Sequence, residues 1–235
     1  MKRRAVKKSV SFHAQVSDNP VDRQENKLEI PGEVKSVLAL PFHLFVVLYS
    51  LFQAGLTDDP FKGMVKGLVS LIVMQFVYGF LLLRSEKKST IGKGKTLRHQ
   101  GDNDVLLVFS STIISAILAN AMFVVLILFG APLYGFRKET YLLACHLSII
   151  IFQPLLILFR LDYNEFGKIF KHDNSYQIVF RNQTLSACLI SLLGSWLGVI
   201  PIPLDWDRPW QQWPTTILIG GYIGAFAGSL LALFL

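Results

Sequence analysis

Apolar residues in this chain come in six long, nearly uncharged runs instead of at the spacing of a soluble domain. A helix rises about 1.5 Å per residue, so about 20 apolar residues cross the roughly 30 Å hydrocarbon core of a bilayer. Only a helix crosses there as a single segment, because each backbone N–H must find an acceptor within it. The pattern predicts an all-α, polytopic membrane protein with about six transmembrane helices. The expected spans are 36–56, 64–83, 105–129, 140–160, 184–200 and 215–235.

The residues before the first run are polar and begin with a basic cluster. No apolar segment follows that cluster directly, which argues against a cleaved signal peptide, so the first span is expected to act as an uncleaved anchor. We expect a disordered, basic cytosolic tail over 1–34 and a six-helix transmembrane domain over 35–235.

The positive charges indicate an orientation. Of the 23 lysines and arginines, 18 fall in the N-terminal segment up to Lys35 and in the segments 84–104 and 160–183. The positive-inside rule then predicts a cytosolic N-terminus, and six spans return the C-terminus to the cytosol. The uncharged C-terminal residues do not constrain the last helix. The net charge of +7 is interpreted as orientation, and no basic stretch interleaved with aromatics predicts nucleic-acid binding.

Six polar side chains are expected at membrane depth, where they are functional candidates or interhelical hydrogen-bonding groups. They are His43, Gln53, Gln75, Asn120, His146 and Gln153. None is a carboxylate, which argues against a proton-coupled transporter. His172 and Asp173 lack the spacing of metal ligands, and both cysteines lie inside apolar runs. We therefore expect no metal, cofactor or catalytic residues.

Glycine recurs at four-residue spacing in the last two runs. Gly194 and Gly198 form a G-x-x-x-G, and Gly220, Gly224 and Gly228 extend the pattern over two turns. Residues four apart share a helix face, and a face without side chains allows another helix to approach closely in lipid. Glycine is also common in membrane helices. Two such faces favour helix packing, either within the chain or with a partner.

Residues 194–214, GSWLGVIPIPLDWDRPWQQWP, contain all four tryptophans of the chain together with four prolines. Tryptophan favours the bilayer interface, and proline fixes φ. One interpretation is an aromatic belt that anchors a tight hairpin. The other is a rigid interfacial surface for a lipid headgroup, a glycan or a partner protein. The candidate residues are Trp196, Pro201, Pro203, Asp205, Trp206, Asp207, Arg208, Pro209, Trp210 and Trp213.

This segment, followed by a glycine-rich last helix, resembles the signature of the phosphatidylinositol-glycan biosynthesis class F (PIG-F) family. The basic N-terminal tail is similar to that of the fungal members, the glycosylphosphatidylinositol (GPI) anchor biosynthesis proteins. The resemblance covers about 36–235 in the layout of the spans and 194–228 in residue detail.

The resemblance implies a multi-pass endoplasmic-reticulum membrane protein of GPI-anchor assembly. It implies a non-catalytic subunit that associates with the phosphoethanolamine transferases that modify GPI mannoses and stabilises them, with a GPI precursor lipid as a further candidate ligand. We expect the glycine faces of the last two spans to receive transferase helices. Alternatives are a lipid carrier or flippase for a GPI precursor or phosphatidylethanolamine, an enzyme acting on phosphoethanolamine, and a scaffold without substrate contact. The sequon at Asn182 is expected to carry no glycan, because it falls beside a cytosolic loop.

Overall fold

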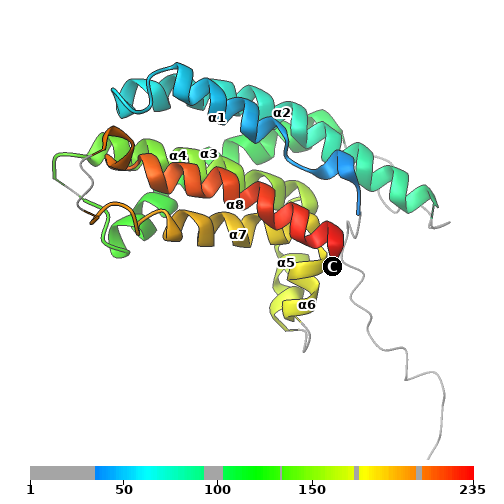
Figure 1. Ribbon diagram of the computed structural model, residues 1–235. Helices are drawn as coiled ribbons and strands as arrows, with labels where there is room; N and C mark the ends of the chain where they lie inside the picture. The colour runs from blue at the N-terminus through cyan, green and yellow to red at the C-terminus, as the bar shows by residue number, and fades with distance from the viewer. Residues whose placement is uncertain (1–34, 93–102, 133, 172–174, 205–207) are drawn as a thin grey trace, which may run out of the picture.

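The computed structural model describes residues 35–92, 103–132, 134–171, 175–204 and 208–235 (Figure 1). The predicted tail, 1–34, lies outside the described residues. The helical elements in chain order are η1 (Val37–Ala39), α1 (His43–Gln53), α2 (Pro60–Gly92), α3 (Asp104–Leu128), α4 (Arg137–Leu158), α5 (Tyr163–Phe170), α6 (Ser175–Arg181), α7 (Gln183–Leu197), η2 (Pro209–Gln211) and α8 (Thr215–Phe234). The described residues contain no strand, and the all-α expectation is confirmed.

Within the described residues, four helices are long and apolar enough to cross a membrane. These are Pro60–Glu86 within α2, Asp104–Leu128, Arg137–Leu158 and Thr215–Phe234. The membrane-protein class expected from the sequence is therefore confirmed. The first and fifth predicted spans correspond to shorter apolar segments, Val37–Gln53 and Gln183–Leu197, and the count of six spans stays a prediction.

The first predicted span is interrupted between η1 and α1. Pro41 lies in this break and has no N–H to continue a helix. The carbonyl of Ala39, at the end of η1, accepts a hydrogen bond of 2.6 Å from the hydroxyl of Tyr78 on α2. The backbone N–H of Ser36 donates to Oε1 of Gln183 at 3.0 Å. Side chains from α2 and α7 thus stabilise a bend that the run of apolar residues does not reveal.

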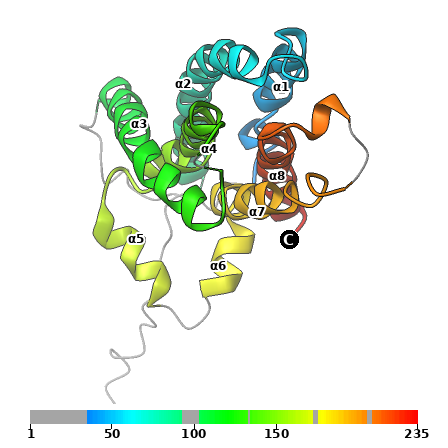
Figure 2. The ribbon, with the colours of Figure 1, turned by 90° about the vertical axis from the view of Figure 1, so that its left-hand side faces the viewer.

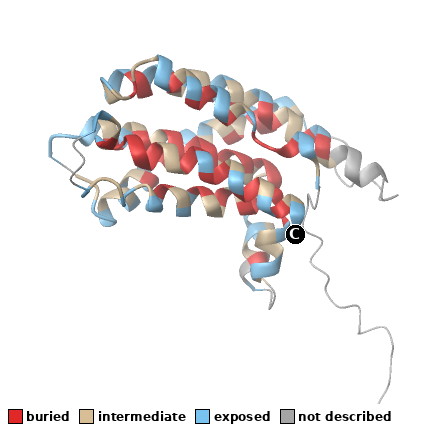
Figure 3. Ribbon diagram, in the orientation of Figure 1, coloured by how far each residue is buried: buried red, intermediate tan, exposed pale blue. Residues whose placement is uncertain are grey.

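The helices that correspond to predicted spans form three hairpins, α1–α2, α3–α4 and α7–α8, that lie side by side (Figure 1). Helix α4 contacts α2, α3, α7 and α8, and 67% of its most apolar stretch of 18 residues is buried, compared with 22% for the same length of α3. Figure 3 shows the buried residues gathered along α4 and α8. The short helix η1, at the blue start of the ribbon, and the C-terminus lie at the same end of the bundle, and the α1–α2, α3–α4 and α7–α8 connections lie at the other (Figure 1).

The segment predicted as a charged loop, 161–183, contains the short helices α5 and α6, which differs from the expectation. Their apolar residues pack on the end of the bundle. Leu158, Phe159 and Leu185 form a buried cluster with Ile169 of α5. These helices are stabilised by tertiary contacts, because isolated helices of this length are unstable in water.

Candidate functional site

The connection between α7 and α8 is organised by Gln211, which the sequence analysis did not single out. Its side-chain amide donates to the carbonyls of Pro201 at 2.8 Å and Leu204 at 2.9 Å. Its Oε1 accepts from the backbone N–H of Arg208 at 2.9 Å. Gln211 is buried, so these bonds replace contacts with water. One side chain therefore holds both halves of the connection together.

Trp213 fixes the same connection to the start of α4. Its indole Nε1–H donates to Oγ1 of Thr140 at 3.0 Å, and its ring packs against the main apolar core. The Thr140 hydroxyl donates in turn to the carbonyl of Phe136 at 2.8 Å. The α3–α4 and α7–α8 connections, which are far apart in sequence, are thus held side by side at one end of the bundle (Figure 2).

The other candidates of the tryptophan-rich segment have varied placements. Asp205, Trp206 and Asp207 lie outside the described residues. The exposed candidates are Trp196, Pro203, Arg208 and Pro209, and the half-buried ones are Pro201 and Trp210. The exposed group, above all the Arg208 guanidinium, is the part of the segment available for recognition.

The glycines of α7 and α8 lie where the two helices approach most closely. A Cβ added at Gly194 would overlap the carbonyl oxygen of Gly220, and one added at Gly224 would overlap that of Ile190. A Cβ at Gly198 would lie 2.7 Å from the Cα of Ile217. The obstructing atoms belong to backbone and cannot move aside.

Both glycine faces are therefore used within the chain. Gly228, one turn beyond Gly224, meets the carbonyl of Ser186 in the same way. The hydroxyl of Ser191 adds a hydrogen bond of 2.9 Å to the carbonyl of Gly221 across the same contact. The expectation that these faces receive helices of a transferase is wrong, because α7 and α8 occupy each other's faces.

Two pairs of polar side chains form hydrogen bonds between neighbouring helices. Nε2–H of His43 on α1 donates to Oε1 of Gln75 on α2 at 2.6 Å. The amide of Gln153 on α4 donates to Oγ1 of Thr112 on α3 at 2.8 Å. Gln53 lies exposed at the end of α1. The interpretation as interhelical hydrogen-bonding groups is confirmed for His43, Gln75 and Gln153.

His146 is fully buried and links three helices. Nε2 lies 3.0 Å from the carbonyl of Met64 on α2, which only accepts, so Nε2 carries the proton. Nδ1 then accepts from the hydroxyl of Tyr222 on α8 at 2.8 Å. At the edge of the bundle, the Tyr141 hydroxyl donates to Oδ1 of Asn120 at 3.3 Å. Both ring nitrogens of His146, the more buried of the two described histidines, are thus engaged in hydrogen bonds between helices.

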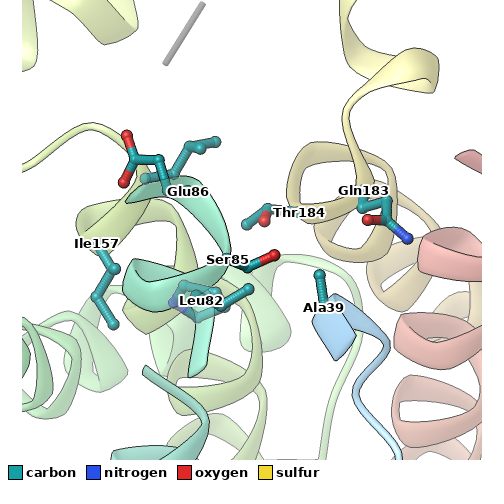
Figure 4. A pocket seen from close by; sticks show the side chains of 9 residues that line it. Ala39, Leu82, Ser85, Glu86, Ile157, Gln183 and Thr184 are labelled. Carbon is teal, nitrogen blue, oxygen red and sulfur yellow. The ribbon is translucent and has the colours of Figure 1, made fainter. Parts of the chain in front are cut away.

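A small cavity at the opposite end of the bundle has a volume of about 30 Å³ and is lined by residues of η1, α2, α4 and α7 (Figure 4). Gln183 borders it with a buried Nε2 that has no partner among the described residues. The Glu86 carboxylate, also in its wall, lies 3.7 Å from the Arg160 guanidinium. A volume of this size suits a single water and not a substrate.

The described residues hold no cluster of three or more histidine, cysteine or acidic side chains. His172 and Asp173 lie outside the described residues. In the α1–α2 connection, the half-buried Asp59 pairs with the exposed Lys62 at 2.9 Å, and the hydrogen bond from Lys62 lowers the pKa of the Asp59 carboxyl.

Comparison with known proteins matches residues 39–233 to the model of the GPI biosynthesis protein family Pig-F. Glycosylphosphatidylinositol anchor biosynthesis protein 11 of Debaryomyces hansenii is 44% identical over 97% of this chain and 96% of its own length. The protein of the same name from Candida albicans is 40% identical, with 98% and 96% covered. The Saccharomyces cerevisiae protein of that name is 28% identical, with 99% and 97% covered. No solved structure matches. The chain belongs to the Pig-F family of GPI biosynthesis proteins.

Proposed function

We propose that this membrane protein of GPI-anchor biosynthesis is a non-catalytic subunit in the endoplasmic reticulum. It binds the phosphoethanolamine transferases that modify GPI mannoses and keeps them folded. Three observations are compatible with this role: four described helices that are long and apolar enough to cross a membrane, a tryptophan-rich connection between α7 and α8, and membership of the Pig-F family.

The observation that carries the proposal is that the buried polar side chains form hydrogen bonds between the helices of this chain. Phosphoethanolamine transfer needs a nucleophile, a base to activate it and an electrophilic clamp for the phosphate. The described buried histidine, His146, has both ring nitrogens bonded to neighbouring helices. His43 and Gln153 likewise bond across helix pairs. These groups stabilise the bundle, and the catalytic groups are assigned to the transferase partner.

The first test depletes this chain in cells and measures transferase abundance and GPI intermediates. We expect lower transferase abundance and accumulation of GPI precursors that lack phosphoethanolamine. Arg208→Ala should reduce GPI maturation at near-normal protein levels if the exposed part of the tryptophan-rich segment contacts substrate or transferase. Lys171→Gln, which removes an exposed charge at the other end of the bundle, is the matched control. Unchanged transferase abundance after depletion would contradict the stabilising role.

The second test asks whether the chain transfers anything by itself. Purified chain is incubated with phosphatidylethanolamine and a mannosylated GPI acceptor, and we expect no product. Product formed while mass spectrometry detects no transferase in the sample would overturn the non-catalytic assignment.

The main alternative is a lipid carrier or flippase for a GPI precursor or phosphatidylethanolamine. The observation in its favour is an apolar groove that opens between α2, α3 and α4. Reconstitution in vesicles with fluorescent phosphatidylethanolamine separates the two functions, because an accessory subunit leaves the rate of transbilayer movement unchanged.

A further inference from the structure

A groove of about 400 Å³ lies between α2, α3 and α4 at the end of the bundle that carries the α3–α4 connection. Its walls are apolar and come from all three helices. They are formed by Phe61 and Val65 of α2, Phe123 of α3, and Tyr141 and Leu142 of α4. Figure 2 looks at this end of the bundle and shows α2, α3 and α4 as neighbours.

Two cations complete the lining of this groove at the start of α4. Arg137 and Lys138 are both exposed, and neither forms an ion pair with another described residue. The Lys138 ammonium lies 5.8 Å from the centre of the Phe61 ring, a distance at which a cation is attracted to an aromatic face. The groove therefore combines an apolar interior with a positive rim.

The charges at the rim favour an anion with a phosphate group. A guanidinium binds phosphate through two parallel hydrogen bonds, and an ammonium adds a point charge. The described lining contains no acidic residue, so an amine-bearing headgroup would find no partner there. The acids nearest to the lining in sequence are Asp59, which precedes α2 and is paired with Lys62, and Glu139, which follows Lys138 in α4 but is not part of the lining.

We propose that this groove binds an anionic phospholipid, whose phosphate lies at Arg137 and Lys138 and whose acyl chain lies along Phe61, Val65 and Phe123. The volume is that of a ligand pocket, whereas a helix with its side chains is about 10 Å wide and needs a longer face. The cations lie where α4 begins, at the depth of headgroups, and the apolar walls extend along helices that span the membrane. The proposal stands whether or not the chain binds a transferase.

The test uses the full chain in phosphatidylcholine nanodiscs, with phosphatidylinositol added and bound lipid measured by native mass spectrometry. We expect retention of phosphatidylinositol over phosphatidylcholine. Each basic residue near a membrane surface contributes about 1 kcal/mol, so the double variant Arg137→Gln/Lys138→Gln should bind phosphatidylinositol roughly 30-fold more weakly. The control Lys171→Gln/Arg181→Gln removes the same charge from exposed positions outside the groove and should bind like the wild type.

Two further arms address the acyl chain. Val65→Trp fills the groove without changing its charge and should also release the lipid, with the melting temperature measured to confirm folding. Inorganic phosphate should compete weakly, because it lacks the chain. Equal retention of both lipids, unchanged binding by the Arg137→Gln/Lys138→Gln variant, or full displacement by inorganic phosphate would each overturn the proposal.

A photo-reactive amino acid at Leu142, in the groove wall, distinguishes a lipid from a protein occupant in native membranes, and the melting temperature of the purified variant confirms that it folds. A crosslinked phospholipid supports the proposal. A crosslinked polypeptide would show that a partner helix fills the groove and would refute it.

Discussion

Replacing Gly224 with alanine tests the close approach of α7 and α8 most directly. The added Cβ would overlap the carbonyl oxygen of Ile190 and lie 3.0 Å from the Cα of Ser191. Both atoms are backbone, so relief requires the two helices to separate. Overpacking costs about 1 to 3 kcal/mol, and a rigid obstacle places this site at the upper end.

Alanine variants of two other helix glycines, Gly221 and Gly167, serve as controls for Gly224→Ala. At Gly221 the added Cβ would meet side-chain atoms, Oγ of Ser195 at 2.6 Å and Cδ2 of Leu147 at 2.7 Å, which can rotate. At Gly167 of α5 it would meet nothing within 4 Å, and the backbone there is not left-handed. Alanine is favoured over glycine in a helix by about 1 kcal/mol. The expected net changes are a loss of about 2 kcal/mol for Gly224→Ala, little change for Gly221→Ala, and a small gain for Gly167→Ala.

Thermal unfolding of the three purified variants in detergent measures this order. One kcal/mol corresponds to about 2 to 4 °C for a chain of this size, so Gly224→Ala should melt about 4 to 8 °C below the wild type. Melting of Gly224→Ala at or above the temperature of Gly167→Ala would refute the backbone contact between α7 and α8. If Gly221→Ala lowers the melting temperature as much as Gly224→Ala does, then the loss of stability does not depend on whether the added Cβ meets backbone or side-chain atoms.

Three further predictions concern the ends of the helices. Gln211→Leu leaves the carbonyls of Pro201 and Leu204 without their partner and should cost about 1 to 3 kcal/mol in thermal unfolding, whereas Gln212→Leu, at an exposed neighbour, should be neutral. Asn182→Ala removes an N-cap of α7 that accepts from the N–H groups of Thr184 and Leu185, both at 3.0 Å, and should lower the free energy of unfolding by about 1 kcal/mol. Because the Asn182 side chain is buried, we also expect no mobility shift when the wild type is treated with endoglycosidase. Cysteine at Tyr134, which is 93% exposed, should react with a membrane-impermeant maleimide only in permeabilised microsomes, and cysteine at Lys171 in intact ones; the reverse pattern would invert the orientation.

The long helices could be predicted from the sequence because their signal is local. The runs 64–83, 105–129 and 215–235 correspond to α2, α3 and α8, since about 20 apolar residues meet the length requirement of a bilayer without reference to any other segment. The break at Pro41 could not be predicted from this criterion. The break is stabilised by the hydrogen bond from Tyr78 to the carbonyl of Ala39, which joins residues 39 apart in sequence.

Contacts between distant segments could not be predicted from the sequence. The four-residue spacing indicated two glycine faces, but the pairing of Gly194 with Gly220 is a tertiary relation that spacing alone does not specify. The groove likewise has no local signal. Its cations follow the α3–α4 connection, and its aromatic walls, Phe61 and Phe123, come from two other helices.

The short length of α7 explains part of the amino-acid composition of the tryptophan-rich connection that follows it. At about 1.5 Å per residue, its 15 residues extend about 22 Å, less than the roughly 30 Å of a hydrocarbon core. The residues after Leu197 therefore continue as turns near the membrane, where each exposed carbonyl needs a partner. Gln211 supplies partners for two such carbonyls, and Trp213 ties the connection to α4. The fold thus accounts for Gln211 and Trp213, whereas it gives the exposed Arg208 no comparable structural role, and Arg208 is the described residue of this connection that we assign to recognition.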